Sequence, residues 1–383
     1  MSMDTQFDDA MMGRALALAQ SARCWASPNP HVGCVLVRDG NVIGEGFTQP
    51  AGSDHAEIVA LQIAGDARGA TAYVTLEPCA HTGRTGACTD ALINAGVKRV
   101  VIAILDPNPQ VNGRGVARLS SAGIAVDVGV GEAQAEAELA GFLLRMRRGW
   151  GRVRLKIASS LDGRTAMASG ESQWITSTAA RQDVQALRAQ STVIITGIGT
   201  VLADDCALTV RAEQLAMTGD ALQRAVYRQP LRVVIDSRCR TPIDAKICAE
   251  GAQTLVAIAE PLDSPRAEAL ITQSKPHLEV VSLPGTVNDG GHQRVDLSAL
   301  MVALGVRGAN EILVEAGPTL AAALLAEELV DELVCYQAPK LLGADARPMV
   351  TMEIGQLAEA VQLSFVDVSR IGDDLRITAV PMY

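Results

Sequence analysis

The sequence predicts an α/β protein of two domains, and three observations lead to that prediction. The chain has 383 residues, more than a single ordinary core accommodates. Short apolar runs of strand length alternate with longer amphipathic runs along most of it. A glycine-punctuated basic segment, Arg148-Gly-Trp-Gly-Arg152, interrupts this alternation once. We therefore expect one domain at residues 1–148 and a second at residues 149–383.

The first domain is expected to open with a strand hairpin and to continue as alternating helices and strands. Such an order predicts a layered sandwich, with helices packed on a sheet. The expected strands are residues 32–38, 41–46, 71–76, 99–104 and 124–128, and the expected helices are residues 8–23, 56–65, 88–95 and 132–147.

After the basic segment the same alternation resumes. Two segments, residues 361–368 and 374–380, flank Ile-Gly-Asp-Asp and are typical of an antiparallel hairpin. Residues 212–229 and 284–296 are expected to be loops or insertions. The remaining expected strands lie near residues 152–158, 192–196, 231–236, 254–258, 278–282, 311–315 and 332–338.

Composition and charge narrow the class of protein. Hydrophobic residues make up 48% and charged residues 20%, so both cores can form without disulfides or other staples. The net charge is −10, with 12 cationic and 15 acidic residues in residues 1–150 and 21 and 28 in the remainder. Neither part is basic, which argues against a nucleic-acid partner. No apolar run reaches membrane-spanning length, and the acidic start does not resemble a signal peptide. We expect a cytosolic homo-oligomer that acts on small molecules.

The eight cysteines should stay reduced in the cytosol, where closely spaced cysteines indicate a metal or catalysis. Cys79 and Cys88 have eight residues between them and enclose a polar segment that follows an apolar strand and precedes a helix. The other six are isolated or lie within a strand and are interpreted as structural: Cys24, Cys34, Cys206, Cys239, Cys248 and Cys335.

A histidine upstream completes a candidate zinc site. His55 and Glu57 open an amphipathic helix, and His55 with Cys79 and Cys88 would give three tetrahedral ligands and leave a fourth position for water. If His81 filled that position, the site would be structural. Zinc lowers the pKa of a bound water to about 7. Glu57 can then carry a proton from the water to a leaving amino group without binding the metal.

The order His-x-Glu followed by Pro-Cys and a second cysteine is typical of zinc-dependent base deaminases, although their cysteines are separated by only two residues. The second domain has no Gly-x-Gly-x-x-Gly fingerprint. Two strand-to-helix junctions, Thr196-Gly-Ile-Gly-Thr200 and Ala316-Gly-Pro-Thr319, could instead accept phosphates at their backbone N–H groups. Such junctions are common in α/β proteins, so they indicate a phosphate site only weakly.

Seven stretches together make a more specific pattern: SPNPHVGCVLV, HAE, TLEPCAHTGRTGAC, DPNPQVNGRG, SLDGRTAMASGESQWITS, GTVLADD and VEAGPTLA. In these stretches the chain resembles the bacterial bifunctional deaminase/reductase family of riboflavin biosynthesis. The resemblance implies a cytidine-deaminase-like α/β/α sandwich followed by a dihydrofolate-reductase-like α/β domain. It also implies deamination of a phosphoribosylamino-pyrimidine, followed by reduction of its ribosyl group to a ribityl chain by NADPH.

The resemblance further implies roles for individual residues. Zn²⁺ would be held by His55, Cys79 and Cys88, with Glu57 as the catalytic proton carrier. Asn29 and Arg84 would hold the pyrimidine and phosphate of the first substrate, although Arg84 could also be a solvated surface charge. NADPH would contact Ala158, Trp174, Thr200, Asp204, Ser237, Gly317, Pro318, Thr319, Leu320, Ala321, Ala322 and Ala323. The second substrate would contact Lys156, Ser172, Arg188, Leu208, Arg211 and Glu315. Leu208 and Ala158 could equally be core residues.

This sequence departs from the family pattern at a few positions near the first site. Thr48 stands where a histidine is usual, Val59 where some members have another histidine, and Gly86 and Ala87 replace two prolines. None of these changes removes a metal ligand, so they affect the expected substrate affinity and not the reaction class.

Two other classes of protein remain to be weighed. A tRNA or DNA base deaminase with an added module would explain the zinc pattern, but not the acidic charge or the second-domain motifs. A non-catalytic protein with structural zinc would not explain Glu57 or the count of three ligands.

Overall fold

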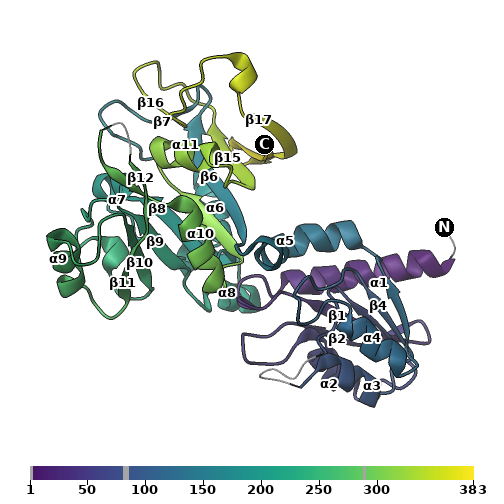
Figure 1. Ribbon diagram of the computed structural model, residues 1–383. Coiled ribbons are helices and arrows are strands. Elements are labelled where there is room, and N and C mark those ends of the chain that lie inside the picture. Colours follow the sequence, from purple (N-terminus) through teal and green to yellow (C-terminus); the bar gives the residue numbers. More distant parts are fainter. Residues whose placement is uncertain (1–2, 81–85, 288–289) are drawn as a thin grey trace. The chain divides into compact units, whose positions relative to one another are not determined.

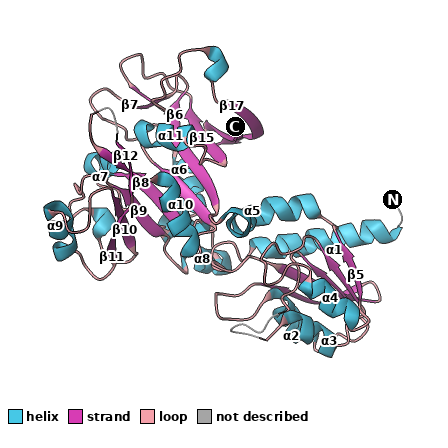
Figure 2. Ribbon diagram, in the orientation of Figure 1, coloured by secondary structure: helices cyan, strands magenta, loops and turns pink. Residues whose placement is uncertain are grey.

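The computed structural model describes residues 3–80, 86–287 and 290–383 (Figure 1). The chain divides into two units, Met1–Gly151 and Arg152–Tyr383, and each is built around its own main sheet. Both units combine helices with strands (Figure 2), so the predicted α/β class is confirmed. Within the described ranges, no helix has the length and apolar character needed to cross a membrane.

The first unit contains a five-stranded sheet in the order β2-β1-β3-β4-β5. Strand β1 pairs antiparallel with β2 and β3, whereas β3, β4 and β5 run parallel. Helices α1 and α5 cover one face of the sheet, and α2, α3 and α4 cover the other (Figure 1). The elements are α1 (Met3–Gln20), β1 (Gly33–Arg38), β2 (Asn41–Phe47), α2 (Ala56–Ala64), β3 (Thr71–Val74), α3 (Cys88–Asn94), β4 (Arg99–Ile102), α4 (Arg114–Ser121), β5 (Ala125–Val128) and α5 (Glu132–Arg148).

Two glycines allow helices to lie directly on this sheet. A Cβ on Gly33 of β1 would lie 1.9 Å from the carbonyl oxygen of Ala15 in α1. A Cβ on Gly46 of β2 would lie 2.3 Å from the carbonyl oxygen of Ala56 in α2. Because only glycine permits this approach, the position of Gly46 fixes the first turn of α2, which carries His55 and Glu57.

The second unit contains a nine-stranded sheet in the order β11-β10-β9-β8-β14-β6-β15-β18-β17. The first seven strands in this order are parallel, and β18 and β17 are antiparallel additions at one edge. The strands are β6 (Arg152–Ser160), β8 (Val193–Gly197), β9 (Leu231–Ile235), β10 (Thr254–Ile258), β11 (Leu278–Ser282), β14 (Glu311–Glu315), β15 (Glu332–Ala338), β17 (Gln362–Ile371) and β18 (Asp374–Met382).

Helices and short ribbons complete the second unit. The α-helices are α6 (Thr178–Gln190), α7 (Ile198–Asp204), α8 (Gly219–Val226), α9 (Pro265–Gln273), α10 (Leu297–Val306) and α11 (Pro318–Ala326). The 3₁₀ turns are η1 (Ala212–Gln214), η2 (Lys246–Cys248) and η3 (Leu357–Glu359). Two small ribbons pair β7 (Arg164–Ala166) with β16 (Arg347–Pro348) and β12 (Pro284–Val287) with β13 (Gln293–Val295).

The predicted C-terminal hairpin is confirmed by β17 and β18, but two predicted loops are wrong. Residues 212–229 contain η1 and α8, and residues 284–296 contain β12 and β13. Helix α8 was missed because it is short and polar and buries only Ala225. The ribbon was missed because it begins Pro284-Gly285 and its strands pair only with each other. Helix α4 was not predicted either; it buries only Gly115 and Leu119.

The packing at Gly46 leads to a stability prediction. Gly46→Ala should lower the free energy of unfolding of the first unit by about 1–3 kcal/mol, because the added methyl overlaps the backbone of α2. It should also weaken zinc binding, because α2 presents His55. Gly13→Ala is the matched control: Gly13 is exposed within α1 and has open space around it, so alanine should stabilise the unit by about 0.5–1 kcal/mol. Thermal unfolding followed by circular dichroism measures both changes. A Gly46→Ala protein as stable as the wild type would contradict the packing described here.

Candidate functional site

Three potential metal ligands of the first unit come together. The ligand atoms of His55, Cys79 and Cys88 all lie within 4.8 Å of one another. His55 Nδ1 is 3.2 Å from Cys88 Sγ and 3.7 Å from Cys79 Sγ. Nitrogen and sulfur ligands of one tetrahedral zinc ion stand about 3.5 Å apart, given Zn–N and Zn–S bonds of roughly 2.0 and 2.3 Å. The donor set therefore fits zinc in both chemistry and spacing.

The fold delivers each ligand from a different element. His55 is the N-cap residue of α2, and Cys88 is the first residue of α3. Cys79 follows β3, and its carbonyl oxygen accepts hydrogen bonds from the N–H and the hydroxyl of Thr89, both at 3.2 Å. Cys88 is fully buried, while His55 and Cys79 are half-buried. One side of the site is thus embedded in the core and the other can be reached.

Glu57 lies beside these ligands in the first turn of α2 and is only 4% exposed. Burial, reinforced by the Cys79 sulfur, raises the pKa of its carboxyl to about 7. Cys88 is close enough to hydrogen-bond to the carboxylate. The side chain is therefore buried next to the ligand set and can take up or release a proton near neutral pH.

The two thiols shift each other's pKa in opposite directions. The pKa of the Cys79 thiol is lowered, chiefly by the hydrogen bond from Cys88, and for the same reason the pKa of Cys88 is raised. Cys79 also accepts the Cys88 backbone N–H at 3.4 Å. The pKa of His55 is raised, mainly by its hydrogen bond to the Cys79 sulfur. This mutual stabilisation prepares Cys79 to bind a cation as thiolate.

Sequence reasoning missed the group that holds the Cys79 loop in place. The buried carboxylate of Glu77 accepts backbone N–H groups of Gly113, Val116 and Asp106 at 3.0, 3.1 and 3.3 Å. Asp106 and Gly113 belong to the DPNPQVNGRG stretch after β4, and Val116 follows it directly in α4. Glu77 therefore fastens that stretch and the start of α4 to the strand end two residues before Cys79. The signal available in the sequence was an acidic residue directly after an apolar strand.

Of the other residues predicted for the first site, Asn29 lies among the described residues. Asn29 is half-buried in the loop before β1, where its backbone N–H donates to the carbonyl oxygen of Ala26 at 3.0 Å. Arg84 and His81 lie outside the described residues. Thr48, which stands at the usual position of a histidine, is buried, and its hydroxyl accepts the Val32 N–H at 2.9 Å.

The other departures from the family pattern are also accommodated. Val59 is half-buried in α2, and Ala87 is the buried N-cap residue of α3. Gly86 has open space around its Cα, so a larger residue would fit there.

The second unit contains a cavity of about 1860 Å³, which exceeds the usual volume of a site for one small ligand. Ten of the twelve residues predicted to bind the cofactor line it, as do all six predicted to bind the second substrate. The exceptions are Ala321 and Ala322, whose side chains are buried within α11. The lining residues from these predictions are Ala158, Trp174, Thr200, Asp204, Ser237, Gly317, Pro318, Thr319, Leu320, Ala323, Lys156, Ser172, Arg188, Leu208, Arg211 and Glu315.

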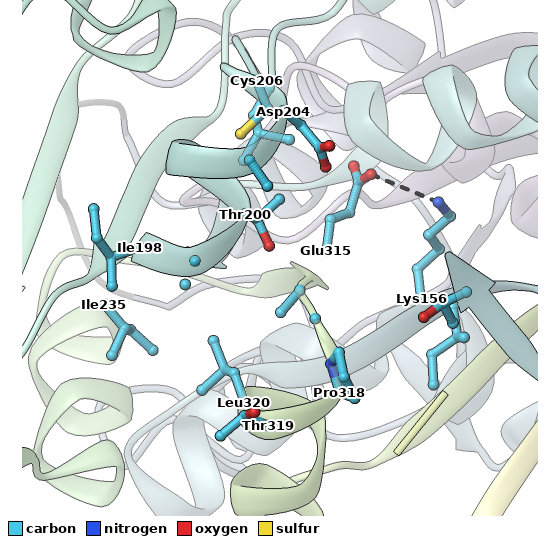
Figure 3. A pocket seen from close by; sticks show the side chains of 18 of the residues that line it. Lys156, Ile198, Thr200, Asp204, Cys206, Ile235, Glu315, Pro318, Thr319 and Leu320 are labelled. Atoms are coloured by element: carbon cyan, nitrogen blue, oxygen red, sulfur yellow. Dashed lines mark ion pairs between the residues drawn. The ribbon is translucent and has the colours of Figure 1, made fainter. Parts of the chain in front are cut away.

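A buried charge network stands at one side of this cavity. The carboxylate of Glu315 accepts two hydrogen bonds from the Arg188 guanidinium, at 2.6 and 3.0 Å, and lies 3.8 Å from Lys156 Nζ (Figure 3). The three side chains are only 11–16% exposed. Burial alone would raise the pKa of Glu315, but Arg188 and Lys156 bring it below its usual value. Burial lowers the pKa of Lys156, against the opposing effect of Glu315.

Arg188 therefore has a partner that sequence reasoning did not foresee. The prediction placed Arg188 against the second substrate. In the structure its guanidinium donates two hydrogen bonds to Glu315 and one to the carbonyl oxygen of Thr209, the last at 3.3 Å. Arg211 is half-buried, and its backbone N–H donates to Gln185 Oε1 at 3.0 Å, whereas its guanidinium has no hydrogen-bond partner among the described residues. The Arg188 guanidinium is therefore engaged by protein groups, and the Arg211 guanidinium is better placed to bind a substrate phosphate.

The other predicted contacts spread along the same cavity. Gly317 is the N-cap residue and Pro318 the first residue of α11, as the sequence indicated. The Ser172 hydroxyl donates to Asp204 at 3.4 Å, which links a predicted substrate residue to a predicted cofactor residue. Trp174 is 63% exposed, and the guanidinium of Arg181 lies 4.4 Å from its ring centroid. Sequence reasoning missed Ile198, Ile235, Arg238 and Arg240, which also line the cavity.

Two family models match the two units. Residues 5–104 match the cytidine and deoxycytidylate deaminase zinc-binding region, and residues 152–377 match the RibD C-terminal domain. The curated protein described as riboflavin biosynthesis protein RibD from Escherichia coli is 51% identical over 96% of this chain and 98% of its own length. The protein of the same description from Haemophilus influenzae is 44% identical over 98% and 97%.

Solved structures agree over the whole length. The Acinetobacter baumannii RibD structure covers 99% of this chain and 100% of its own, with 43% identity and a TM-score of 0.87. A Thermotoga maritima structure described as a diaminohydroxyphosphoribosylaminopyrimidine deaminase/5-amino-6-(5-phosphoribosylamino)uracil reductase also covers 99% and 100%, with 29% identity and a TM-score of 0.84.

The fold and the sites thus define a bifunctional enzyme, in which a zinc-binding deaminase unit is followed by a reductase unit. The chain belongs to the RibD family of riboflavin biosynthesis proteins. The predicted family, its fold class and its two activities are confirmed.

The ligand geometry leads to a prediction about Glu57. Glu57→Gln should retain about one zinc per chain but slow ammonia release by at least a hundredfold, because an amide cannot carry the proton. Cys88→Ser should lose the metal. Cys34→Ala is the matched control, because Cys34 is a buried cysteine near Glu57 that lies outside the ligand set and should keep both metal and activity. Metal analysis and an ammonia assay measure these outcomes. Loss of zinc from Glu57→Gln would show that Glu57 is a ligand.

The charge network leads to a second prediction. Glu315→Gln should weaken use of the pyrimidine substrate in the reductase step and leave ammonia release and NADPH affinity nearly unchanged. It should also cost about 3–5 kcal/mol of unfolding free energy, because Arg188 and Lys156 would stay buried without their counter-charge.

Glu311→Gln is the matched control for this variant. Glu311 begins the same strand, is similarly buried and pairs bidentately with Arg152 at 3.0 Å, but it does not line the cavity. It should cost stability without altering substrate use. Steady-state kinetics and fluorescence titration with NADPH distinguish the two variants. An equal loss of NADPH affinity in Glu315→Gln would contradict the assignment of Glu315 to the substrate.

Proposed function

We propose that this enzyme first hydrolyses the amino group of 2,5-diamino-6-(5-phosphoribosylamino)pyrimidin-4-one to give 5-amino-6-(5-phosphoribosylamino)uracil. In the second unit, the ribosyl group would then be reduced to a ribityl chain, with NADPH as the source of hydride. The proposal rests on the presence of two sites in one chain. The first unit has a His–Cys–Cys ligand set beside a buried glutamate, and the second has a large, charged cavity. The description of the Thermotoga maritima relative supports the same two reactions.

In the deaminase step, His55, Cys79 and Cys88 hold zinc. When bound, zinc supplies Lewis acidity that activates water near neutral pH. Glu57 would take a proton from the attacking water and deliver it to the departing amino group, and its burial beside the ligand set without being a ligand supports this role. Asn29 and Arg84 hold the pyrimidine and its phosphate.

In the reductase step, the residues that line the cavity would hold NADPH, and the start of α11 would accept its diphosphate. The backbone N–H groups after Gly317 and the positive end of the helix favour a diphosphate there. Thr200, Asp204, Ser237 and the α11 residues to Ala323 contact the cofactor, and Ala158 and Trp174 border its reactive end. When bound, NADPH supplies the hydride.

The second substrate lies against the buried charge network. Glu315 accepts hydrogen bonds from ribose hydroxyls, and Lys156 donates to the same sugar from the neighbouring strand. Arg211 meets the terminal phosphate, and Arg188 holds the Glu315 carboxylate in position. Ser172 and Leu208 complete the wall. Positioning of the ribose against the hydride donor accounts for most of what the protein must contribute.

The domain boundaries and assembly form part of the proposal. We assign residues 1–148 to deamination and residues 149–383 to reduction, and we propose a cytosolic homo-oligomer that binds neither nucleic acid nor membrane. Exposed apolar residues on the edge strand β17, among them Phe365, Val366 and Val368 at 69%, 66% and 55% exposure, support association between copies.

One assay tests the proposed function directly. Purified protein loaded with zinc is mixed with the diaminopyrimidine and NADPH, and ammonia and NADPH absorbance are followed together. We expect ammonia release with or without NADPH, and NADPH oxidation only after deamination has supplied the uracil. Removal of zinc with a chelator should stop both reactions from the diaminopyrimidine but spare reduction of added uracil substrate. Ammonia release from RNA or DNA bases in place of the pyrimidine would contradict the proposal.

A further inference from the structure

The cavity of the second unit has two chemically different ends. In Figure 3, Lys156 and Glu315 lie on one side, Ile198 and Ile235 lie on the other, and Pro318 and Leu320 lie between them. The charged end holds the residues assigned to the sugar substrate. On the proposed function, the hydride-donating half of the dinucleotide must face that end. Its adenosine half then extends toward Ile198 and Ile235, where aliphatic side chains offer apolar contact.

Strand β9 ends at this apolar side, and the residue that follows it is an acid that is turned away from the cavity. Asp236 is fully buried and does not line the cavity, whereas Ile235, Ser237 and Arg238 on either side of it do. Its Oδ2 accepts the backbone N–H groups of Arg240 and Thr241 and the Thr241 hydroxyl, at 2.5–2.7 Å. The carboxylate is therefore engaged in closing the turn after β9.

The orientation of this acid matters for the choice of dinucleotide. In α/β enzymes that use NADH, an acidic side chain near a strand end commonly accepts a hydrogen bond from the adenosine ribose 2′-hydroxyl, whereas in those that use NADPH an arginine there meets the 2′-phosphate. Here the acid is withdrawn into the turn, and the turn presents Ser237, Arg238 and Arg240 to the cavity instead.

These three side chains offer donors that suit a phosphate. The Ser237 Oγ accepts the Val295 N–H at 3.2 Å, so its own hydrogen remains to donate. Arg238 is exposed, and no carboxylate in the described part of the chain forms an ion pair with it. Arg240 is also exposed and reaches Asp236 Oδ1 only at 4.0 Å. An arginine fork can pair with two phosphate oxygens at once.

A third arginine on the same side is less suitable. Arg294 lines the cavity from β13, but Asp296 and Glu327 line it too. The pKa of Glu327 is raised, chiefly by burial and further by Asp296, while Arg294 opposes the rise. Both Asp296 and Arg294 therefore act electrostatically on Glu327. The acids offset the charge of Arg294, whereas Arg238 forms no ion pair with an acid in the described part of the chain.

We propose that Arg238, assisted by Arg240 and Ser237, binds the 2′-phosphate of the dinucleotide and gives the reductase its preference for NADPH over NADH. This inference rests on the proposed function, since it needs a dinucleotide in the cavity. It adds the group that is recognised and the residues that recognise it.

The test compares ligands that differ only in the 2′-phosphate. Calorimetry of the full-length protein measures the affinity for NADPH and NADH, and for adenosine 2′,5′-bisphosphate and adenosine 5′-monophosphate. In Arg238→Ala, affinity for NADPH and the bisphosphate should fall by at least about tenfold, because a charge-assisted hydrogen-bond pair is lost. Affinity for NADH and the monophosphate should stay within about twofold. Arg238→Lys should recover part of the loss, and the double variant with Arg240→Ala should lose more.

Arg370→Ala is the control for the change in net charge. Arg370 is an exposed cation on β17, pairs with Asp373 at 3.8 Å and does not line the cavity. It should leave all four affinities unchanged. Equal losses for NADPH and NADH in Arg238→Ala, or an unchanged preference in the double variant, would overturn the inference and leave the proposed function standing. A wild-type protein that binds neither dinucleotide would overturn both.

Discussion

The parallel pairing of β14 with its two neighbours is the constraint on which the reductase unit depends. β14 is hydrogen-bonded to β6 on one side and β8 on the other, and its register sets Glu315 directly opposite Lys156. Because parallel strands end on the same side of a sheet, residues far apart in the sequence meet at one edge. Gly197, Ser237 and Gly317 follow from the same geometry, since each lies at or just beyond a carboxyl end. The cavity thus lies where the carboxyl ends of the parallel strands bring these residues together.

The deaminase unit obeys the same rule with a shorter sheet. β3 and β4 run parallel, so the loops after them leave the sheet side by side. The first loop carries Glu77 and Cys79, and the second supplies the backbone N–H groups that Glu77 accepts. The histidine comes from α2, which is held against β2 by the absence of a side chain at Gly46. The parallel pairing of β3 with β4, the hydrogen bonds of Glu77 and the close approach of α2 at Gly46 therefore together position the three ligands.

Much of this could be predicted from the sequence, because strands and ligand motifs are local patterns. The strand positions, the final hairpin and the association of His55 with Cys79 and Cys88 needed only periodicity and residue chemistry. The fork between Arg188 and Glu315 could not be predicted, because it joins residues 127 positions apart whose contact depends on the packing of α6 beside β14. The orientation of the Asp236 side chain could not be predicted from the sequence for a related reason. The sequence pattern of an acidic residue after a strand is the same whether its side chain faces a ligand or hydrogen-bonds within its own turn.

We propose that the dinucleotide binds at the carboxyl edge of the second sheet and at no other part of that unit. Hydrogen exchange of the full-length protein, measured by mass spectrometry with and without NADPH, tests this most directly. The account predicts slower exchange at residues 197–204, 236–241 and 317–323, at the ends of β8, β9 and β14. It predicts no change at residues 190–192, 228–230 and 307–310, which precede the same strands at the opposite edge. Slower exchange at the opposite edge, or equal slowing at both edges, would contradict it.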